Sequence, residues 1–278
     1  VSDALILLSL MVGQVAVPWW LVHEGGAHDL ALWAGALALG SLLALPLMSP
    51  LGDRVSKRTL ISAGVALSLA KGLALAALVQ AGRYHIGMVI ALELVGVVAM
   101  AALMPAIFSI VAELLPAEQL NEGLALQKSA QALGRLLGPV LGGGMLALGG
   151  SALALWGHVV LLALAFALAL RIETAAAALG VANAAHWWRD LRAGLAAKWH
   201  PRLERGWTFV SFCVMVFFSP AIGMLVPLKV QALGLSGAWL GACEAGLSAG
   251  MLVGSLGYST WLAERVGRFR ASVGSILL

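Results

Sequence analysis

The chain has 278 residues, of which 61% are hydrophobic and 11% are charged, with a formal net charge of +4 and a mean hydropathy of +0.96. Soluble domains carry about a quarter charged residues, so this composition excludes a water-soluble fold. The basic residues fall in short clusters between apolar runs, which argues against nucleic-acid binding. Cys213 and Cys243 lie in apolar stretches without the spacing of a zinc site or a disulfide framework.

Eight apolar runs are each long enough to cross a hydrocarbon core of about 30 Å. In chain order they cover residues 4–22, 30–50, 60–79, 86–104, 124–148, 151–170, 208–231 and 238–261. The first run has neither a basic start nor a small-residue cleavage site, so we interpret it as a retained span rather than a signal peptide. Residues 271–278 are apolar again, and they predict the start of a ninth span in a chain that continues beyond Leu278.

Lys and Arg are distributed unequally between alternate connections, which predicts the orientation of the chain. One side holds only Arg83 and Lys229. The other side holds Arg54, Lys57, Arg58, Arg171, Arg189, Arg192, Lys198, Arg202, Arg205, Arg265, Arg268 and Arg270. The positive-inside rule makes this second, basic side cytoplasmic.

The longest connection, residues 171–206, is polar and divides the chain into two halves. Within it Trp187, Leu191, Leu195 and Trp199 recur every four residues and form one apolar stripe on a predicted helix. Such a helix is expected to lie on the inner membrane surface. The alternative is that the stripe packs on the cytoplasmic ends of the spans.

A short charged pattern recurs at the same place in each half. Asp53-Arg54-Val55-Ser56-Lys57 follows the second span, and Glu264-Arg265-Val266-Gly267-Arg268 follows the eighth. A repeat of this kind predicts two six-helix halves and an expected total of twelve spans. The domains would then be an N-terminal half at 1–170, a cytoplasmic linker with an amphipathic helix at 171–206, and an incomplete C-terminal half at 207–278.

Two motifs resemble those of the major facilitator superfamily. Between the second and third spans the acid and the bases of the superfamily signature match Asp53, Arg54, Lys57 and Arg58, whereas serine replaces glycine at positions 49 and 56. The run Gly134-Arg-Leu-Leu-Gly-Pro-Val-Leu-Gly-Gly143 resembles the helix-five motif of the antiporter branch, although the upstream glycine is Ala125. The stretch between Pro105 and Gly143 is most similar to bacterial exporters of the enterobactin and macrolide efflux group.

This resemblance implies an all-α integral membrane fold of the major facilitator type in the inner (plasma) membrane of a bacterium. It further implies a monomeric secondary transporter that contacts membrane lipids and exports a small amphipathic, drug-like or siderophore-like compound by proton antiport and alternating access. The chain has no Walker A or HExxH motif, so we expect no enzyme, cofactor or metal site.

Other functions stay open at this point. One alternative is a lysophospholipid flippase or a sugar transporter of the same fold. A membrane-embedded lipid-modifying enzyme is the alternative of another class, and it would have to use the acidic connection. That connection contains Glu113, Glu118 and Glu122 but no histidine.

Ionisable residues inside the bilayer are costly, and they are functional candidates by default. They are Lys71, Glu93, Arg135 and Glu244. The resembled fold lines its central cavity with helices one, two, four, five, seven and eight, which implies that Gln14, Glu93, Arg135 and Glu244 contribute to the substrate or proton pathway. Glu93 and Arg135 are candidates for an ion pair, either broken in transport or permanent. Lys71 would lie outside the cavity, facing a neighbouring helix or an acid.

Glycines four residues apart predict close packing of the fifth span. Gly134, Gly138 and Gly142, with Pro139 and Gly143 beside them, give a face that a second backbone can approach and a point where the helix can bend. The eighth span has a similar face at Gly246, Gly250 and Gly254.

The repeated charged turns are predicted to latch the cytoplasmic side in one state. The predicted latch comprises Asp53, Arg54, Lys57, Arg58, Glu113, Glu264, Arg265 and Arg268. In it Asp53 either caps the third helix or holds Arg54 against Glu113.

Overall fold

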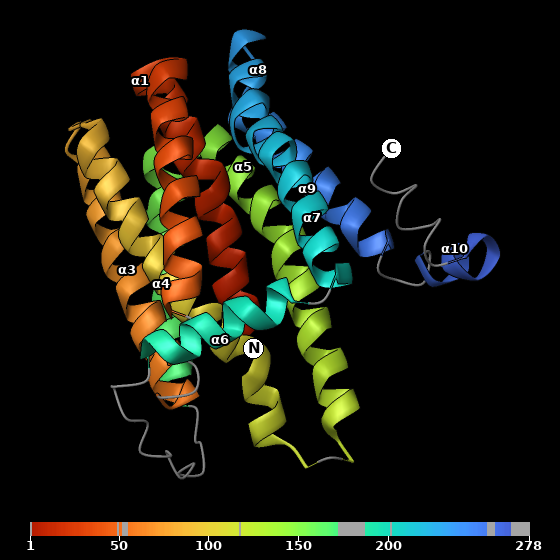
Figure 1. Cartoon of the computed structure of the whole chain (residues 1–278). Coiled ribbons are helices and arrows are strands. Elements are labelled where there is room, and N and C mark those ends of the chain that lie inside the picture. Colours follow the sequence, from red (N-terminus) through yellow and green to blue (C-terminus); the bar gives the residue numbers. More distant parts are fainter. Residues whose placement is uncertain are drawn as a thin grey trace.

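The structure is a computed structural model that describes residues 2–48, 50–51, 55–116, 118–171, 187–200, 202–254 and 259–267. Across these ranges the regular structure is helical and contains no strand (Figure 1). The helices are α1 (Ser2–Met48), α3 (Lys57–Gln80), α4 (Ile86–Leu114), α5 (Leu120–Ala169), α6 (Trp187–Trp199), α7 (Arg202–Pro220), the π-helical turn η2 (Ala221–Leu225), α8 (Val226–Ala232), α9 (Gly237–Val253) and α10 (Ser259–Val266).

The two longest helices each contain two predicted spans. α1 has 47 residues and α5 has 50. A straight helix of that length would extend about 70 Å, more than twice the hydrocarbon core. Each of the two helices instead turns back at a glycine with a positive φ. These glycines are Gly26 in α1 and Gly150 in α5, and φ is 67° at both. Glycine accepts this conformation without the steric cost that a side chain would bring.

All eight predicted spans coincide with helices, but two boundaries differ. The helix of the seventh span begins earlier, at Arg202, and continues through η2 to the end of α8. The helix of the eighth span ends at Val253, whereas the predicted span runs on to Trp261. Trp261 belongs instead to α10, where the Arg265 guanidinium carbon lies 4.6 Å from the centre of the indole ring. This ring and the neighbouring charges favour a surface helix over a continued span.

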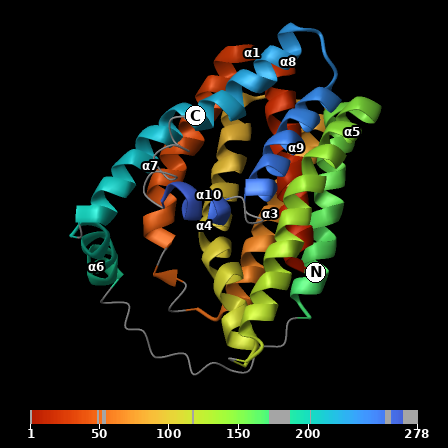
Figure 2. The same ribbon diagram turned by 90° about the vertical axis from the view of Figure 1, so that its right-hand side faces the viewer.

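Two apolar clusters fill the structure at opposite ends. The outer cluster includes Trp19, Trp20, Leu155, Val230 and Leu240, and it therefore joins α1 and α5 to α8 and α9. The inner cluster draws its residues from α1, α3, α4, α5 and the connection after α1. Figures 1 and 2 both show α8 beside the bend of α1, at the end opposite α6. The positive-inside rule predicts that this outer end is extracytoplasmic.

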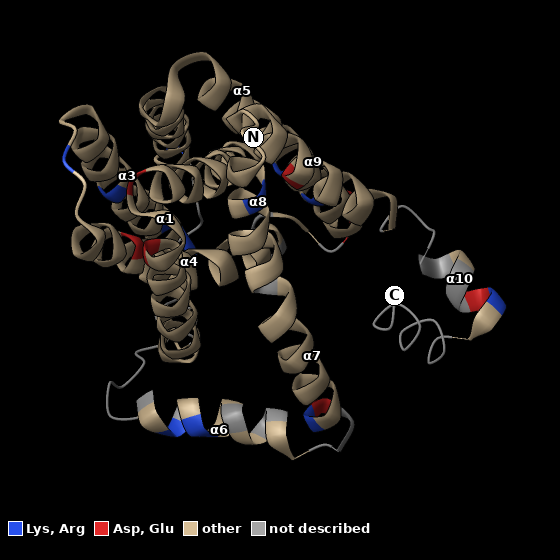
Figure 3. Cartoon of the chain, turned by 90° about the horizontal axis from the view of Figure 1, so that it is seen from above, with Lys and Arg blue, Asp and Glu red and all other residues tan. Residues whose placement is uncertain are grey.

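The linker contains a helix where one was predicted, α6, and it lies across the direction of the long helices (Figure 1). Viewed from above, Lys and Arg are visible along α6, while the long helices carry few charges (Figure 3). Trp188 and Trp199 are exposed on it. The predicted division into 1–170, 171–206 and 207–278 stays a prediction.

The predicted glycine face of α5 packs on α1. A Cβ atom at Gly134 would lie 2.7 Å from the Ala4 carbonyl oxygen, and one at Gly142 would lie 3.2 Å from the Cα of Val12. Gly138 meets Met11 in the same way. In a membrane such close backbone contact, rather than the hydrophobic effect, drives helix association.

The packing face predicted for α9 makes no contact with the described residues. A Cβ at Gly246, Gly250 or Gly254 would meet no described atom within 4 Å. The glycines that pack are Gly237 and Gly241, because the start of α9 meets α5 shortly before α5 turns back at Gly150. A Cβ at Gly143 of α5 would lie 2.8 Å from the Cα of Gly241.

We expect Gly241→Leu to destabilise the protein in detergent by about 1–3 kcal/mol, because the leucine must displace the backbone of α5. The matched control is Gly250→Leu on the same helix, where the side chain enters open space. Thermal unfolding followed by fluorescence would measure both variants. Equal stability of the two variants would contradict the packing described for α9.

Candidate functional site

A crevice between α5 and α9 opens below the point where these helices touch. It is a cavity of about 210 Å³, and we call it the inner crevice. Its lining comprises Lys128, Gln131, Ala132, Arg135, Ser248, Met251 and Leu252. The α5 residues recur every three or four positions, so they project from one face of the helix.

The polar groups of the inner crevice carry an uncompensated positive charge. Lys128 and Arg135 are exposed, and in the described part of the chain no ion pair reaches either of them. Gln131 is buried between them and adds an amide, while Met251 and Leu252 form an apolar wall. Such a site suits a ligand with an apolar body and an anionic or hydrogen-bond-accepting group.

Among the predicted pathway residues, only Arg135 lines the inner crevice. Glu244 lies one turn before Ser248 on α9, outside the lining, and Gln14 is exposed on α1. Glu93 lies elsewhere, buried in α4. The sequence analysis missed Lys128 and Gln131. Their spacing of seven and four residues from Arg135 indicates that all three lie on one face of the same helix.

The predicted ion pair between Glu93 and Arg135 is wrong. Lys71 of α3 donates to Glu93 of α4, with 2.9 Å between Nζ and Oε1, and only 10% and 11% of the two side chains are exposed. Gly96 provides the room, because a Cβ there would lie 2.9 Å from the Cδ of Lys71. Glu93 faces α3, whereas Arg135 faces α9, so the two cannot meet in this arrangement.

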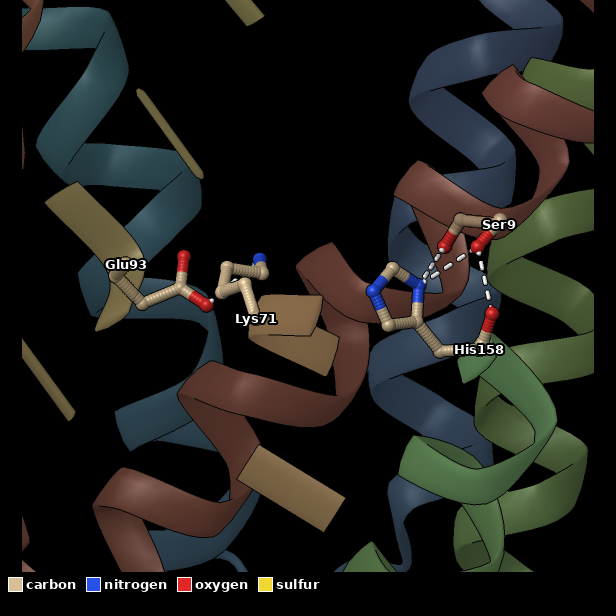
Figure 4. Close-up of polar contacts among 4 residues, drawn as sticks. All are labelled: Ser9, Lys71, Glu93 and His158. Atoms are coloured by element: carbon tan, nitrogen blue, oxygen red, sulfur yellow. Dashed lines mark hydrogen bonds and ion pairs between the residues drawn. The ribbon is translucent and has the colours of Figure 1, made fainter. Parts of the chain in front are cut away.

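A second buried polar group, His158, was missed altogether. It is 2% exposed, and its Nδ1 lies 2.8 Å from both the hydroxyl and the carbonyl oxygen of Ser9 on α1 (Figure 4). The Ser9 hydroxyl donates in turn to the His158 carbonyl oxygen at 2.9 Å. The only sequence signal was a single histidine within an apolar run.

Polar contacts also hold the outer end. The Tyr84 hydroxyl donates to Asp29 at 2.7 Å, and Gln231 of α8 donates to the Val22 carbonyl oxygen of α1 at 3.0 Å. The bond from Tyr84, and then that from His28, hold the pKa of Asp29 below its usual value. Burial, and then the bond to Asp29, raise the pKa of Tyr84, which keeps its phenol protonated as a donor. These contacts tie α1 to its neighbours outside the spans.

Half of the predicted latch residues lie outside the part of the chain that the structure describes. Asp53, Arg54 and Arg268 lie outside the described residues, as does the side chain of Glu113. Lys57 begins α3, which is capped by the Ser56 hydroxyl accepting from the Thr59 amide at 3.2 Å. Arg58 donates to the Leu170 carbonyl oxygen at the end of α5, at 3.1 Å. Glu264 and Arg265 lie in α10.

Comparison with known proteins agrees with this architecture. A family model described as Major Facilitator Superfamily matches residues 4–278, a range that contains both the inner crevice and the buried polar residues. No curated protein matches the chain. The family match confirms the predicted all-α membrane fold of this type.

We expect Glu93→Gln to destabilise the protein by about 3–5 kcal/mol, because it leaves the Lys71 ammonium buried without its counter-charge. The double variant Lys71→Met/Glu93→Gln removes both charges and should recover most of that loss. Unfolding in detergent would measure the coupling as a double-mutant cycle. Additive losses would show that the two residues do not interact.

Proposed function

We propose that this chain, which belongs to the major facilitator superfamily and is thus a secondary transporter, exports a small amphipathic compound in exchange for protons. The observation that carries the proposal is the inner crevice, where two cations without an ion-pair partner among the described residues face an apolar wall. We further propose the inner membrane of a bacterium as its location and the enterobactin and macrolide efflux group as its branch.

The conformation supports loading of the substrate from the cytoplasm. At the outer end α1 is joined to α8 and α9 through the outer cluster and the bond between Gln231 and Val22. The inner crevice lies toward the other end, where α5 and α9 no longer touch at their glycines. A transporter in this form presents its binding groups inward, as an exporter must before it rocks.

The chemistry of the crevice favours an anionic amphipathic substrate. The Arg135 guanidinium can donate two hydrogen bonds to a carboxylate, or bind a phenolate oxygen, and Lys128 adds a second positive charge about two turns away. Siderophore-like compounds fit this description. A lysophospholipid also combines an acidic group with an apolar chain, so a flippase is the second candidate, whereas sugars favour more hydroxyl-binding groups than Gln131 and Ser248 offer.

We assign the proton pathway to carboxylates inside the spans. Glu244 lies on the face of α9 that carries Ser248, one turn nearer the outer contact. A proton on Glu244 would lower the negative charge next to a bound anion, so proton and substrate binding would influence each other. Glu93 and Gln14 complete the proposed set, Glu93 as a buried acid and Gln14 as a neutral hydrogen-bonding group.

The test of this proposal is transport by the protein in proteoliposomes with an imposed pH gradient. We expect Arg135→Gln to raise KM for an anionic amphipathic substrate about tenfold or more, because a hydrogen bond to a charged group contributes about 1.5–3 kcal/mol. Arg83→Gln, on the outer turn, is the matched control with unchanged KM. Movement of a labelled lysophospholipid alone would favour the flippase. An unchanged KM for Arg135→Gln would exclude the inner crevice as the substrate-binding site.

The latch is a separate proposal. We expect Asp53→Asn to slow transport several-fold while expression and substrate affinity stay intact, because even about 1 kcal/mol shifts an equilibrium poised near unity. Lys57→Arg, which keeps the charge, should be nearly silent. Transport rates in proteoliposomes would measure both, and a wild-type rate for Asp53→Asn would refute the latch.

A further inference from the structure

We infer that Lys71, Glu93 and His158 form a proton-binding site inside the helices that precede the linker, in which Nε2 of His158 is a second acceptor for the Lys71 ammonium. The residues lie on α3, α4 and α5, and none of them lines the inner crevice. The inference therefore stands independently of the proposed substrate.

The hydrogen bonds fix the tautomer of His158. A carbonyl oxygen only accepts, so the short contact between Nδ1 and the Ser9 carbonyl places the ring hydrogen on Nδ1. The Ser9 hydroxyl gives its own hydrogen to the His158 carbonyl, which leaves its lone pairs to face Nδ1 as well. Nε2 consequently carries a lone pair, and within the described residues this buried atom has no hydrogen-bond partner.

Small residues hold the imidazole between α1 and α3. A Cβ at Gly13 would lie 3.2 Å from the ring Cε1, and a Cβ at Gly72 would lie 3.2 Å from Cδ2 and 3.4 Å from Nε2. Gly72 directly follows Lys71, so the edge of the ring that bears Nε2 packs on α3 next to the lysine. Figure 4 shows this edge turned toward Lys71 and Glu93 and the opposite edge toward Ser9.

The proposed position of the added proton is the Glu93 carboxylate. Among the described residues, the polar side chain of α1 next to the ring is the neutral Ser9. On the other side lies Lys71 of α3, and Glu93 of α4 is bonded to that lysine. The ion pair is neutral as it stands. A proton from water that binds the Glu93 carboxylate forms one O–H bond and breaks none in the cluster, but it deprives Lys71 of its counter-charge.

The lone pair of His158 compensates for this loss. Once Glu93 is neutral, the Lys71 ammonium can donate to Nε2, so a buried cation keeps a charge-assisted hydrogen bond. Because the three groups interact, the proton belongs to the cluster rather than to one residue. Ser9 acts as a positioning residue, since its two oxygens hold the hydrogen on Nδ1 and keep Nε2 free.

The test is nitrogen-15 NMR of the protein in lipid nanodiscs, labelled at its six histidines. The signals of His158 are those lost in His158→Gln. We expect wild-type His158 to show the Nδ1–H tautomer with an unbonded Nε2. Glu93→Gln, which mimics the protonated acid, should move the Nε2 signal to that of a hydrogen-bonded acceptor. The double variant Lys71→Met/Glu93→Gln should return it to the wild-type position.

His85→Gln, which changes an exposed histidine, is the control and should leave the His158 signals unchanged. If Glu93→Gln does not fold, acidification of the wild-type protein should move the Nε2 signal in the same direction without adding a hydrogen to Nε2, and Lys71→Arg should preserve the response. An Nε2–H tautomer would overturn the inference. So would a Nε2 signal that responds neither to Glu93→Gln nor to acid.

Discussion

The close contact between the first half of α1 and α5 is the interaction on which the rest of the structure depends. Gly134, Gly138 and Gly142 let the backbone of α1 lie directly on α5, and the stretch 15–22 of α1 is buried throughout. Lipid is as apolar as leucine, so packing of this kind supplies the attraction that water supplies in a soluble core. α1 also reaches α8 and α9 through the outer cluster, and its position therefore determines where the later helices lie.

The sequence predicts the helices well because the bilayer imposes a length and a polarity on every span. It also predicts the glycine face of α5, since a spacing of four is local to one helix. The equivalent face of α9 was predicted at Gly246, Gly250 and Gly254, yet contact occurs at Gly237 and Gly241. Where two helices cross is a tertiary property, and the spacing of glycines in one chain segment does not encode it.

The polar sites also combine features that are local to one helix with contacts that depend on how helices pack. The sequence shows that Lys71 and Glu93 lie in apolar spans, where a charge is costly. Their pairing, however, depends on how α3 and α4 are rotated about their axes. His158 carries no motif, and its importance appears only once Ser9, far away in the sequence, is found against its ring. Lys128 and Gln131 could have been associated with Arg135 from their spacing, because all three share one helix face.

Two kinds of charge thus coexist in the helices. Lys71 is buried and compensated by Glu93, as a permanently enclosed cation must be, whereas Lys128 and Arg135 are exposed and unpaired in the described structure. α1 lies between the two environments. Its residues Leu8 and Met11 contact Gly138, one turn from Arg135, while Ser9 and Gly13 of the same turns contact His158. A displacement of α1 relative to α5 would therefore change the surroundings of His158 and the position of the Arg135 face together, which would connect the proposed proton binding mechanically to the inner crevice.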